Sequence, residues 1–429
     1  MINVGTMIGS GIFLVPATIA LYLQSSWLVV LAWVIGGIVS LLGALSVAEL
    51  GAMYPRAGGI FVYLREAYGP LWGFLYGWTA VAVINTASVS AVAVGFATYL
   101  GFFVALSPLD IKVVAIGSIV FLTAVNCFGL KSGARVQNSF TFLKIATIGA
   151  IALLALTKGN FANLTSIGHL PALSDMAGPI GLALVAVLWS YDGWIEITYV
   201  AGEVQDPQKN MPRSLILSTL LVILCYVIVN LAFFSILSVE AISKSALVAA
   251  DAFTSTIGPA GAALAAIAVM VAAFGCNNGM VLSGARIYYA MASERVFFRS
   301  LARVHPRYHT PVLALIVQGV WASLLVLTGT FDQLFTYVIF SSWIFYAMAA
   351  GAVIVLRRIS PHVARPYRAW GYPYTPVVFI LFSLYLVVNT LIHDPRDGII
   401  GLGIILLGLP AYLYWSRKQS ATDAATTIS

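Results

Sequence analysis

Apolar stretches of about twenty residues with almost no charge recur along the whole chain. They predict about twelve membrane-spanning helices, because a backbone inside a bilayer has to pair its own polar groups. The alternation of apolar and polar residues expected of barrel strands is absent. We therefore expect an all-α membrane protein. The predicted segments are 1–23, 27–54, 70–105, 111–130, 135–157, 177–203, 212–238, 258–292, 311–329, 332–356, 373–392 and 397–416.

Composition indicates one membrane domain without a separate soluble unit. Of the 429 residues, 61% are hydrophobic and 9% are charged, whereas a soluble domain carries roughly a quarter charged residues. The three cysteines lie far apart in apolar segments and give neither a disulfide framework nor metal-ligand spacing. In a membrane protein the net charge of +7 reports loop orientation rather than nucleic-acid binding. We expect no cofactor, no metal and no nucleic-acid partner.

The distribution of basic residues orients the chain. With the N-terminus inside, the cytoplasmic loops and tail hold sixteen of the 22 Lys and Arg residues and the outer loops hold four. The remaining two, Lys144 and Arg286, lie within spans. By the positive-inside rule, both termini are predicted to be cytoplasmic, in a plasma or bacterial inner membrane.

The first segment contains a glycine run, Gly5–Phe13, in the middle of the span. Three glycines and Ser10 favour unwinding, which is tolerated only beside a cavity or packed protein. A half-helix that begins near Ile12 would direct its N-terminal amides and its positive dipole end at such a cavity, as suits a carboxylate. The alternative is a close-packing site for a neighbouring helix.

The sixth segment contains a second candidate break at Asp192 and Gly193. A carboxylate next to a glycine in mid-span is costly and favours a functional interruption. Carbonyls around Trp189 and Ser190 would face a substrate ammonium, while the first break would face its carboxylate. The two breaks are five spans apart, which is the spacing that two inverted five-helix repeats require.

Several motifs in order along the chain resemble the amino acid–polyamine–organocation superfamily, and within it the bacterial L-type amino-acid transporters. Met7–Phe13 is similar to the first-helix motif of that superfamily, and Tyr191–Trp194 is similar to its sixth helix. The other matching stretches are Ala48–Gly51, Tyr54–Gly59, Gly202–Arg213 and Arg365–Pro373.

The resemblance implies a leucine-transporter-type fold of five plus five inverted helices, with discontinuous helices 1 and 6 and two extra helices. The repeats would be residues 1–157 and 158–358, followed by helices 11 and 12 with a cytoplasmic tail in 359–429. It also implies roughly four more helical turns before the first motif, so we expect a longer native N-terminus or a misassigned start.

The resemblance also assigns binding residues by position. Carboxylate contacts fall on Ser10 and Gly11, with Ile12 adjacent, and Trp189 occupies the place of the usual gating phenylalanine. A larger ring there would narrow the pocket or tighten the gate. Amine contacts fall on the backbone carbonyls of Met7, Trp189, Ser190 and Asp192.

Charged and polar residues inside the spans add further candidates. The resemblance places the ammonium of Lys144 where sodium sits in sodium-coupled relatives, bridging helices 1 and 8; the alternative is a lysine that snorkels to the interface. Glu196 lies on the same helix face as Asp192. It would accept a proton, contact a basic substrate, pair with Lys144 or simply line the inner vestibule. Asn85 and Ser342 are candidates for lining the side-chain pocket.

The function that these features favour is sodium-independent secondary transport, with exchange the expected mode, of small or mid-sized neutral L-amino acids by alternating access. The nearest alternative is a proton-coupled or exchange carrier of basic amino acids or polyamines, and a non-transporting amino-acid sensor is a third. An enzyme is excluded by the lack of a catalytic pair, metal cluster or phosphate loop. The expected partners are an amino-acid substrate and the lipid bilayer, with no obligatory protein partner.

Overall fold

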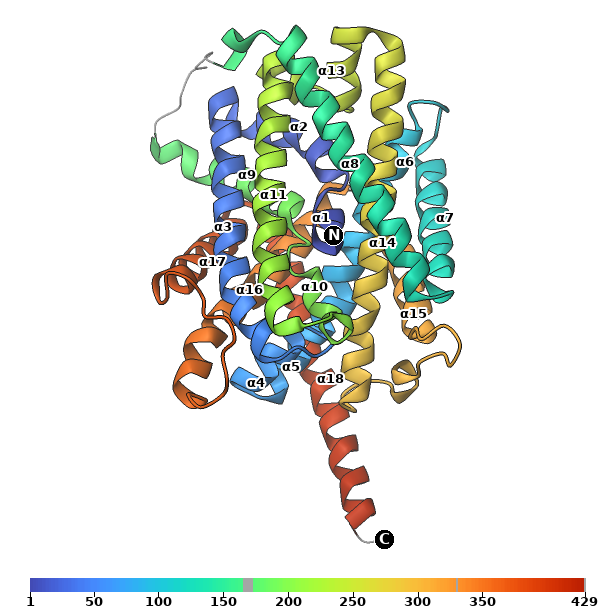
Figure 1. Cartoon of the computed structure of the whole chain (residues 1–429), viewed down its shortest axis with the longest axis vertical. Coiled ribbons are helices and arrows are strands. Elements are labelled where there is room, and N and C mark those ends of the chain that lie inside the picture. Colours follow the sequence, from blue (N-terminus) through green and yellow to red (C-terminus); the bar gives the residue numbers. More distant parts are fainter. Residues whose placement is uncertain (165–172, 329–330, 428–429) are drawn as a thin grey trace.

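The computed structural model describes residues 1–164, 173–328 and 331–427. All regular elements in these ranges are helical, and they form one elongated bundle from which the end of the last helix projects (Figure 1). Among the described residues, nine helices are long and apolar enough to cross a membrane, and three shorter apolar helices accompany them. Each predicted segment coincides with one helix or with a broken pair, so the all-α multi-span fold is confirmed.

The helices within the predicted segments include two that are broken and one that contains a π-helical stretch. In chain order they are α1 (Ile2–Met7) with α2 (Gly11–Leu23), α3 (Ser26–Met53), α5 (Pro70–Thr79) with the π-helix η1 (Ala80–Ile84) and α6 (Asn85–Leu100), α7 (Pro108–Cys127), α8 (Leu130–Lys158), α9 (Leu173–Tyr191) with α10 (Glu196–Tyr199) and η3 (Ala201–Glu203), α11 (Pro207–Ile236), α14 (Pro259–Ser293), α15 (Val312–Thr328), α16 (Phe331–Ile359), α17 (Tyr374–His393) and α18 (Pro395–Thr427). Short helices connect them: α4 (Ile60–Tyr68), η2 (Phe161–Leu164), α12 (Val239–Ser243), α13 (Val248–Ile257) and η4 (Arg299–Ala302).

The outer surface of the bundle carries many large apolar side chains, as a lipid environment requires. On α8, for example, Phe142 is 74% exposed and Leu156 is 70% exposed. Contiguous apolar surface of this kind is rare on soluble monomers. Large aromatic side chains such as Trp33, Trp194 and Trp343 fill the centre. Hydrophobicity therefore specifies that the helices cross lipid, and packing of bulky rings fixes which helices meet.

Helices that are five spans apart in the sequence pack against one another. The contacting pairs are α2 with α9, α3 with α11, α6 with α14, and α7 with α15. In Figure 1, α3 and α11 run side by side along the length of the bundle. This pairing brings the first predicted break next to the second one.

Several boundaries differ from those predicted. α8 begins at Leu130 rather than at 135, and α18 continues to Thr427. The helices α12 and α13 fill the loop before α14, and η1 interrupts the third span. Helices of five and ten residues are too short to give the apolar signal of a span, and a π-helical turn changes the hydrogen-bond register without changing composition.

Candidate functional site

The first span is broken where the glycine run predicts it. α1 ends at Met7 and α2 begins at Gly11, with Ile8, Gly9 and Ser10 between them. Ile8 leaves the helical region with φ −76° and ψ 89°. Glycines lie within and beside this stretch, and a glycine has no side chain to restrict the backbone to the helical conformation. The first amides of α2 and the last carbonyls of α1 therefore lack their intrahelical partners.

The second break follows α9, which ends at Tyr191. Gly193 has φ +106°, a conformation that L side chains rarely adopt, and α10 is a single turn that begins at Glu196. The break thus falls at Asp192–Ile195, as the aspartate–glycine pair predicts.

The two breaks contact each other directly. The Asn3 side-chain amide donates to the Trp194 carbonyl at 2.6 Å, and its oxygen accepts from the Ile197 amide at 2.9 Å. The Thr6 hydroxyl donates to the Gly193 carbonyl at 3.2 Å. Side chains on α1 therefore bond to backbone groups of the second break that have lost their helical partners, so the two breaks behave as one unit.

Gly11, Trp189 and Ser190 also meet at this junction. A Cβ added to Gly11 would lie 2.8 Å from the Ser190 Oγ and 3.0 Å from the Trp189 ring. The Trp189 ring packs on Phe335 of α16 with a centroid separation of 5.5 Å. Ser10 is fully buried, and its hydroxyl has no hydrogen-bond partner in the structure. Four of the residues assigned by resemblance, these three with Ser10, thus lie at or beside the junction, and the amide end of α2 faces the carbonyl end of α9.

The Asp192 side chain contacts α16. Its Oδ1 accepts a hydrogen bond of 2.8 Å from the hydroxyl of Tyr346. Trp194 packs edge-on against the same tyrosine at 5.5 Å. This anchor on α16 fixes the start of the second break.

Lys144 of α8 is 1% exposed and reaches α1. Its Nζ donates to the carbonyl of Gly5 at 2.7 Å. A Cβ on Gly275 of α14 would lie 3.2 Å from the Lys144 Cε. A lysine that snorkels to the interface would be exposed at its tip, so the buried ammonium contradicts the snorkelling alternative. The ammonium instead lies between α1 and α14 below the first break.

Glu196 is 7% exposed and accepts a hydrogen bond from the hydroxyl of Ser283 on α14. Two other acidic residues near the ends of spans, Glu203 and Glu49, are paired with arginine. Arg286 Nε contacts Glu203 at 3.1 Å, and Arg357 makes a two-pronged contact with Glu49 at 2.6 and 2.9 Å. The hydrogen bond of Glu196 therefore joins α10 to α14. No ion pair of Glu196 is found among the described residues.

The two further pocket candidates lie on α6 and α16. Asn85 packs against Gly284 of α14, and its Oδ1 has no hydrogen-bond partner. Ser342 is fully buried on α16, and its hydroxyl is unpartnered. Their place in a side-chain pocket stays a prediction.

Sequence reasoning missed the polar side chains that hold the breaks. Asn3 lies shortly before the glycine run and Thr6 lies within it, and polar residues on a six-residue half-helix are a usable signal. Tyr226 of α11 was also missed. Its hydroxyl lies 2.5 Å from the Met7 carbonyl and 2.9 Å from the Ser190 carbonyl. A tyrosine in an apolar span is ordinary in composition, so only the fold reveals it.

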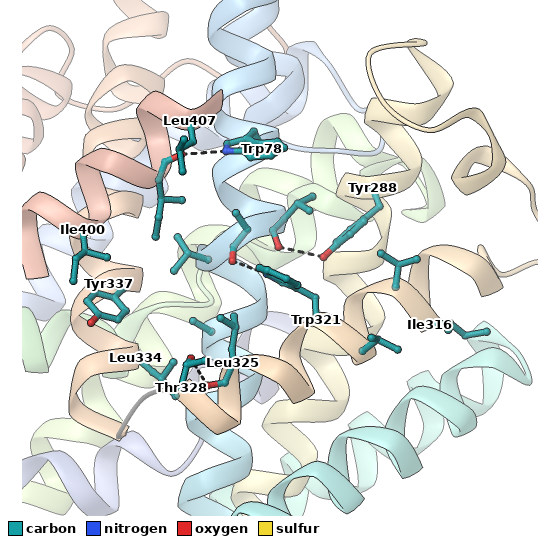
Figure 2. Close-up of a pocket in the computed structure, with 17 residues that line it drawn as sticks. Trp78, Tyr288, Ile316, Trp321, Leu325, Thr328, Leu334, Tyr337, Ile400 and Leu407 are labelled. Carbon is teal, nitrogen blue, oxygen red and sulfur yellow. Dashed lines mark hydrogen bonds between the residues drawn. The ribbon is translucent and has the colours of Figure 1, made fainter. Parts of the chain in front are cut away.

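A separate cavity of about 780 Å³ lies between α5, η1, α14, α15, α16 and α18. Figure 2 shows that its walls are apolar and that Trp321, Tyr288 and Trp78 turn their polar atoms to backbone carbonyls. No residue of either break lines it. A zwitterion would find no ionic partner there, so the junction of the breaks is the better candidate site.

The junction offers chemistry suited to a zwitterion. The N-terminal amides of α2 form an anion site with a favourable helix dipole. The C-terminal carbonyls of α1 and α9 provide acceptors for an ammonium. No group of three His, Cys, Asp or Glu side chains in the described residues has the arrangement of a metal site.

Comparison with known proteins gives matches over nearly the whole chain. The amino acid permease family matches residues 1–409. The serine/threonine exchanger SteT of Bacillus subtilis (strain 168) is 35% identical over 98% of this chain and 95% of its own length. The b(0,+)-type amino acid transporter 1 of Mus musculus is 31% identical over 92% of this chain and 81% of its own. The large neutral amino acids transporter small subunit 2 of Mus musculus is 32% identical over 97% and 80%.

Proposed function

Because this chain belongs to the amino acid permease family, a family of membrane transporters and not of enzymes, we propose that it is a sodium-independent exchanger of small or mid-sized neutral L-amino acids. Amino-acid transport is the activity that its relatives share by name. The size class of the substrate, the exchange mode and the sodium independence are our proposals.

The contact between the two breaks is the observation that supports this proposal most strongly. The amide end of α2 and the carbonyl ends of α1 and α9 meet in a buried place, where a carboxylate and an ammonium a few ångströms apart would both find partners. Trp189, stacked on Phe335, would gate the side-chain end of the site. Its bulk favours serine-sized to leucine-sized substrates.

The transport cycle would move one repeat against the other. We propose residues 1–157 and 158–358 as the two inverted repeats, with 359–429 as an addition. The packing of helices five spans apart supports this division. The bonds from Asn3 and Thr6 to the second break would lie at the boundary between the two moving repeats.

Lys144 supports sodium independence. Its ammonium contacts the Gly5 carbonyl. Backbone carbonyls next to a helix break are the groups that coordinate sodium in transporters with broken helices. A resident positive charge repels a second cation at that place. We therefore propose that Lys144 fills the role of a coupling ion permanently.

Two further proposals concern the setting of the protein. It is a multi-pass membrane protein, and we propose the plasma or inner membrane with cytoplasmic termini, from the basic inner loops. We also propose that it acts without an obligatory protein partner. One relative is named as a small subunit, so the purified single chain is the form to test.

A counterflow assay tests the function. Purified protein in liposomes loaded with unlabelled amino acid should accumulate labelled neutral L-amino acids, in sodium and in choline buffers alike. Twenty amino acids and common polyamines form the panel, with and without a proton gradient. Uptake confined to arginine or polyamines would favour a basic-substrate carrier, and binding without any uptake would favour a sensor.

A further inference from the structure

A smaller cavity, of about 400 Å³, lies among loops and helix ends at the face that we propose to be cytoplasmic. Its walls come from the loop 54–59 after α3, from η3, from α14 and from the loop before α15. The residues that line it in the described part of the chain belong to neither helix break. Its volume falls within the range of pockets that hold small ligands, so the chemistry of its walls decides what it can bind.

The wall of this cavity contains a buried guanidinium that is not fully paired. Arg286 of α14 is 3% exposed; its Nε donates to Glu203 at 3.1 Å and its Nη1 donates to the Leu282 carbonyl. Its Nη2 is also buried and has no hydrogen-bond partner among the described residues. A buried donor on a charged group costs free energy when it is left unsatisfied. An acceptor is therefore missing beside Arg286.

Other donors line the same cavity from different segments. Arg56 lies in the loop after α3, Tyr289 lies on α14, and His309 lies in the loop before α15. Arg56 is 51% exposed and is paired with Glu66 at 2.7 Å. A guanidinium has five N–H donors, so this pair leaves several of them for a ligand. Together with Arg286, the donors come from three separate segments of the chain.

The charge around the cavity favours an anion. Residues 295–311, which supply part of its wall, contain four arginines and two histidines but no aspartate or glutamate. Glu203 is the one acidic residue that lines the cavity in the described ranges, and it is already bonded to Arg286. An excess of basic side chains raises the local concentration of anions.

The arrangement of the donors fits a phosphate group better than a carboxylate. Guanidinium groups bind both kinds of anion through two parallel hydrogen bonds. A carboxylate presents two oxygens in one plane, whereas a phosphate group presents at least two further-spread oxygens around a tetrahedron and accepts strong hydrogen bonds on each. Donors from three separate segments therefore match the phosphate.

We propose that this cavity is a phosphate-binding site in which Arg286 is the principal donor and Arg56 and His309 surround the same group. The phosphate belongs either to a free compound or to the headgroup of an anionic lipid at the same face, since both present the same oxygens. The occupant would join α14 to the loop after α3. The Gly58 amide of that loop bonds to the Tyr199 carbonyl at the end of α10 at 3.1 Å, so the occupant would also brace the chain that follows the second break.

Binding of radiolabelled inorganic phosphate to the purified full chain in detergent tests the proposal. In Arg286→Gln, which removes the charge, Kd should rise at least about tenfold, the effect of losing a charge-assisted hydrogen bond. Arg303→Gln is the matched control, because it removes an equal charge from the basic loop at an exposed residue that does not line the cavity; its Kd should equal that of the wild type. If Arg286→Gln does not insert, His309→Asn takes its place. Asparagine tolerates the left-handed φ of +53° at this residue, and Kd should rise about threefold.

Native mass spectrometry with added phosphatidylglycerol distinguishes the two sources of the phosphate. If a lipid headgroup occupies the site, Arg286→Gln should retain fewer lipid molecules than the wild type and Arg303→Gln should not, and the lipid should displace labelled phosphate. If a free compound occupies it, all three proteins should retain the lipid equally while only Arg286→Gln loses phosphate.

Three results would overturn the inference. A wild type that binds neither phosphate nor the lipid would show that the cavity holds water alone. An unchanged Kd in Arg286→Gln, or in His309→Asn where that variant replaces it, would show that these donors do not meet the anion. Equal weakening in Arg303→Gln would indicate attraction by the whole basic face. None of these assays measures transport, so their outcome is independent of the proposed function.

Discussion

Replacement of Lys144 by methionine separates a transport role from a structural one. The Lys144 ammonium is 1% exposed and donates at 2.7 Å to the carbonyl of Gly5, on a half-helix of only six residues. Methionine has nearly the same length and volume but neither charge nor donor. The substitution therefore removes one contact between α8 and α1 and leaves the packing against Gly275 in place.

The expected effects on stability and on transport differ in size. A hydrogen bond to a charged group contributes about 1.5–3 kcal/mol, while burial of an ammonium costs several kcal/mol, so an apolar isostere is often neutral. We expect the free energy of unfolding of Lys144→Met to change by about 1 kcal/mol or less. Transport loses the hydrogen bond that anchors α1. If that bond contributes about 2 kcal/mol to transport, its loss corresponds to roughly a thirtyfold fall in uptake.

Uptake of a neutral amino acid into proteoliposomes, with melting of the purified protein in detergent, measures both effects. Lys112→Met is the matched control, because Lys112 also donates to a backbone carbonyl, that of Leu327 at 3.0 Å, but at the surface; its uptake should equal the wild type. Normal uptake by Lys144→Met would refute the role given to the ammonium. Wild-type uptake that disappears in choline buffer would refute sodium independence.

Three further substitutions test other parts of the site. Gly193→Ala should abolish counterflow, because Gly193 has φ +106° and a Cβ there would lie 3.1 Å from the Thr6 backbone. Gly149→Ala is the control and should keep counterflow, because Gly149 faces open space. Equal activity of the two variants would contradict the close contact of the breaks. Glu49→Gln should lower stability by about 3–5 kcal/mol, since it removes the charge of a buried carboxylate that pairs with Arg357 and Arg365. Glu66→Gln, in a more exposed pair, should lower it by less than about 1 kcal/mol, as compared by thermal melting. Trp189→Phe should lower KM for leucine relative to serine by enlarging the pocket, and an unchanged ratio in the counterflow panel would show that this ring does not limit substrate size.

The sequence predicts the number of spans and both helix breaks, because lipid imposes strong rules on composition. A run of glycines and an aspartate–glycine pair in mid-span are rare enough to locate Met7–Gly11 and Asp192–Ile195 as interruptions. The same rules exclude a soluble fold outright. A buried lysine in an apolar span is likewise conspicuous, and its contact with α1 agrees with the interpretation made from the sequence.

Partners between helices are much harder to predict. Nothing in the spacing of Asn3 or Tyr226 says which backbone groups they meet. Asn3 bonds to the Trp194 carbonyl, about 190 residues away, and Tyr226 bonds to the Met7 carbonyl, about 220 residues away. Glu196 illustrates the same limit, since its contact with Ser283 depends on how α10 faces α14. Asn85 and Ser342 were placed in the pocket by span alone, and rotation of the helix about its axis decides whether such residues reach the site.

The most direct test of the shared site compares ligands that lack one of the two charges. In wild-type counterflow of labelled L-serine, competition by serinol, which lacks the carboxylate, and by glycerate, which lacks the ammonium, is measured beside unlabelled L-serine. If the two breaks hold one zwitterion, each analogue should compete at least about a hundredfold more weakly, because each loses charge-assisted bonds to one break. Competition by either analogue as strong as that of L-serine would contradict a site built from both breaks.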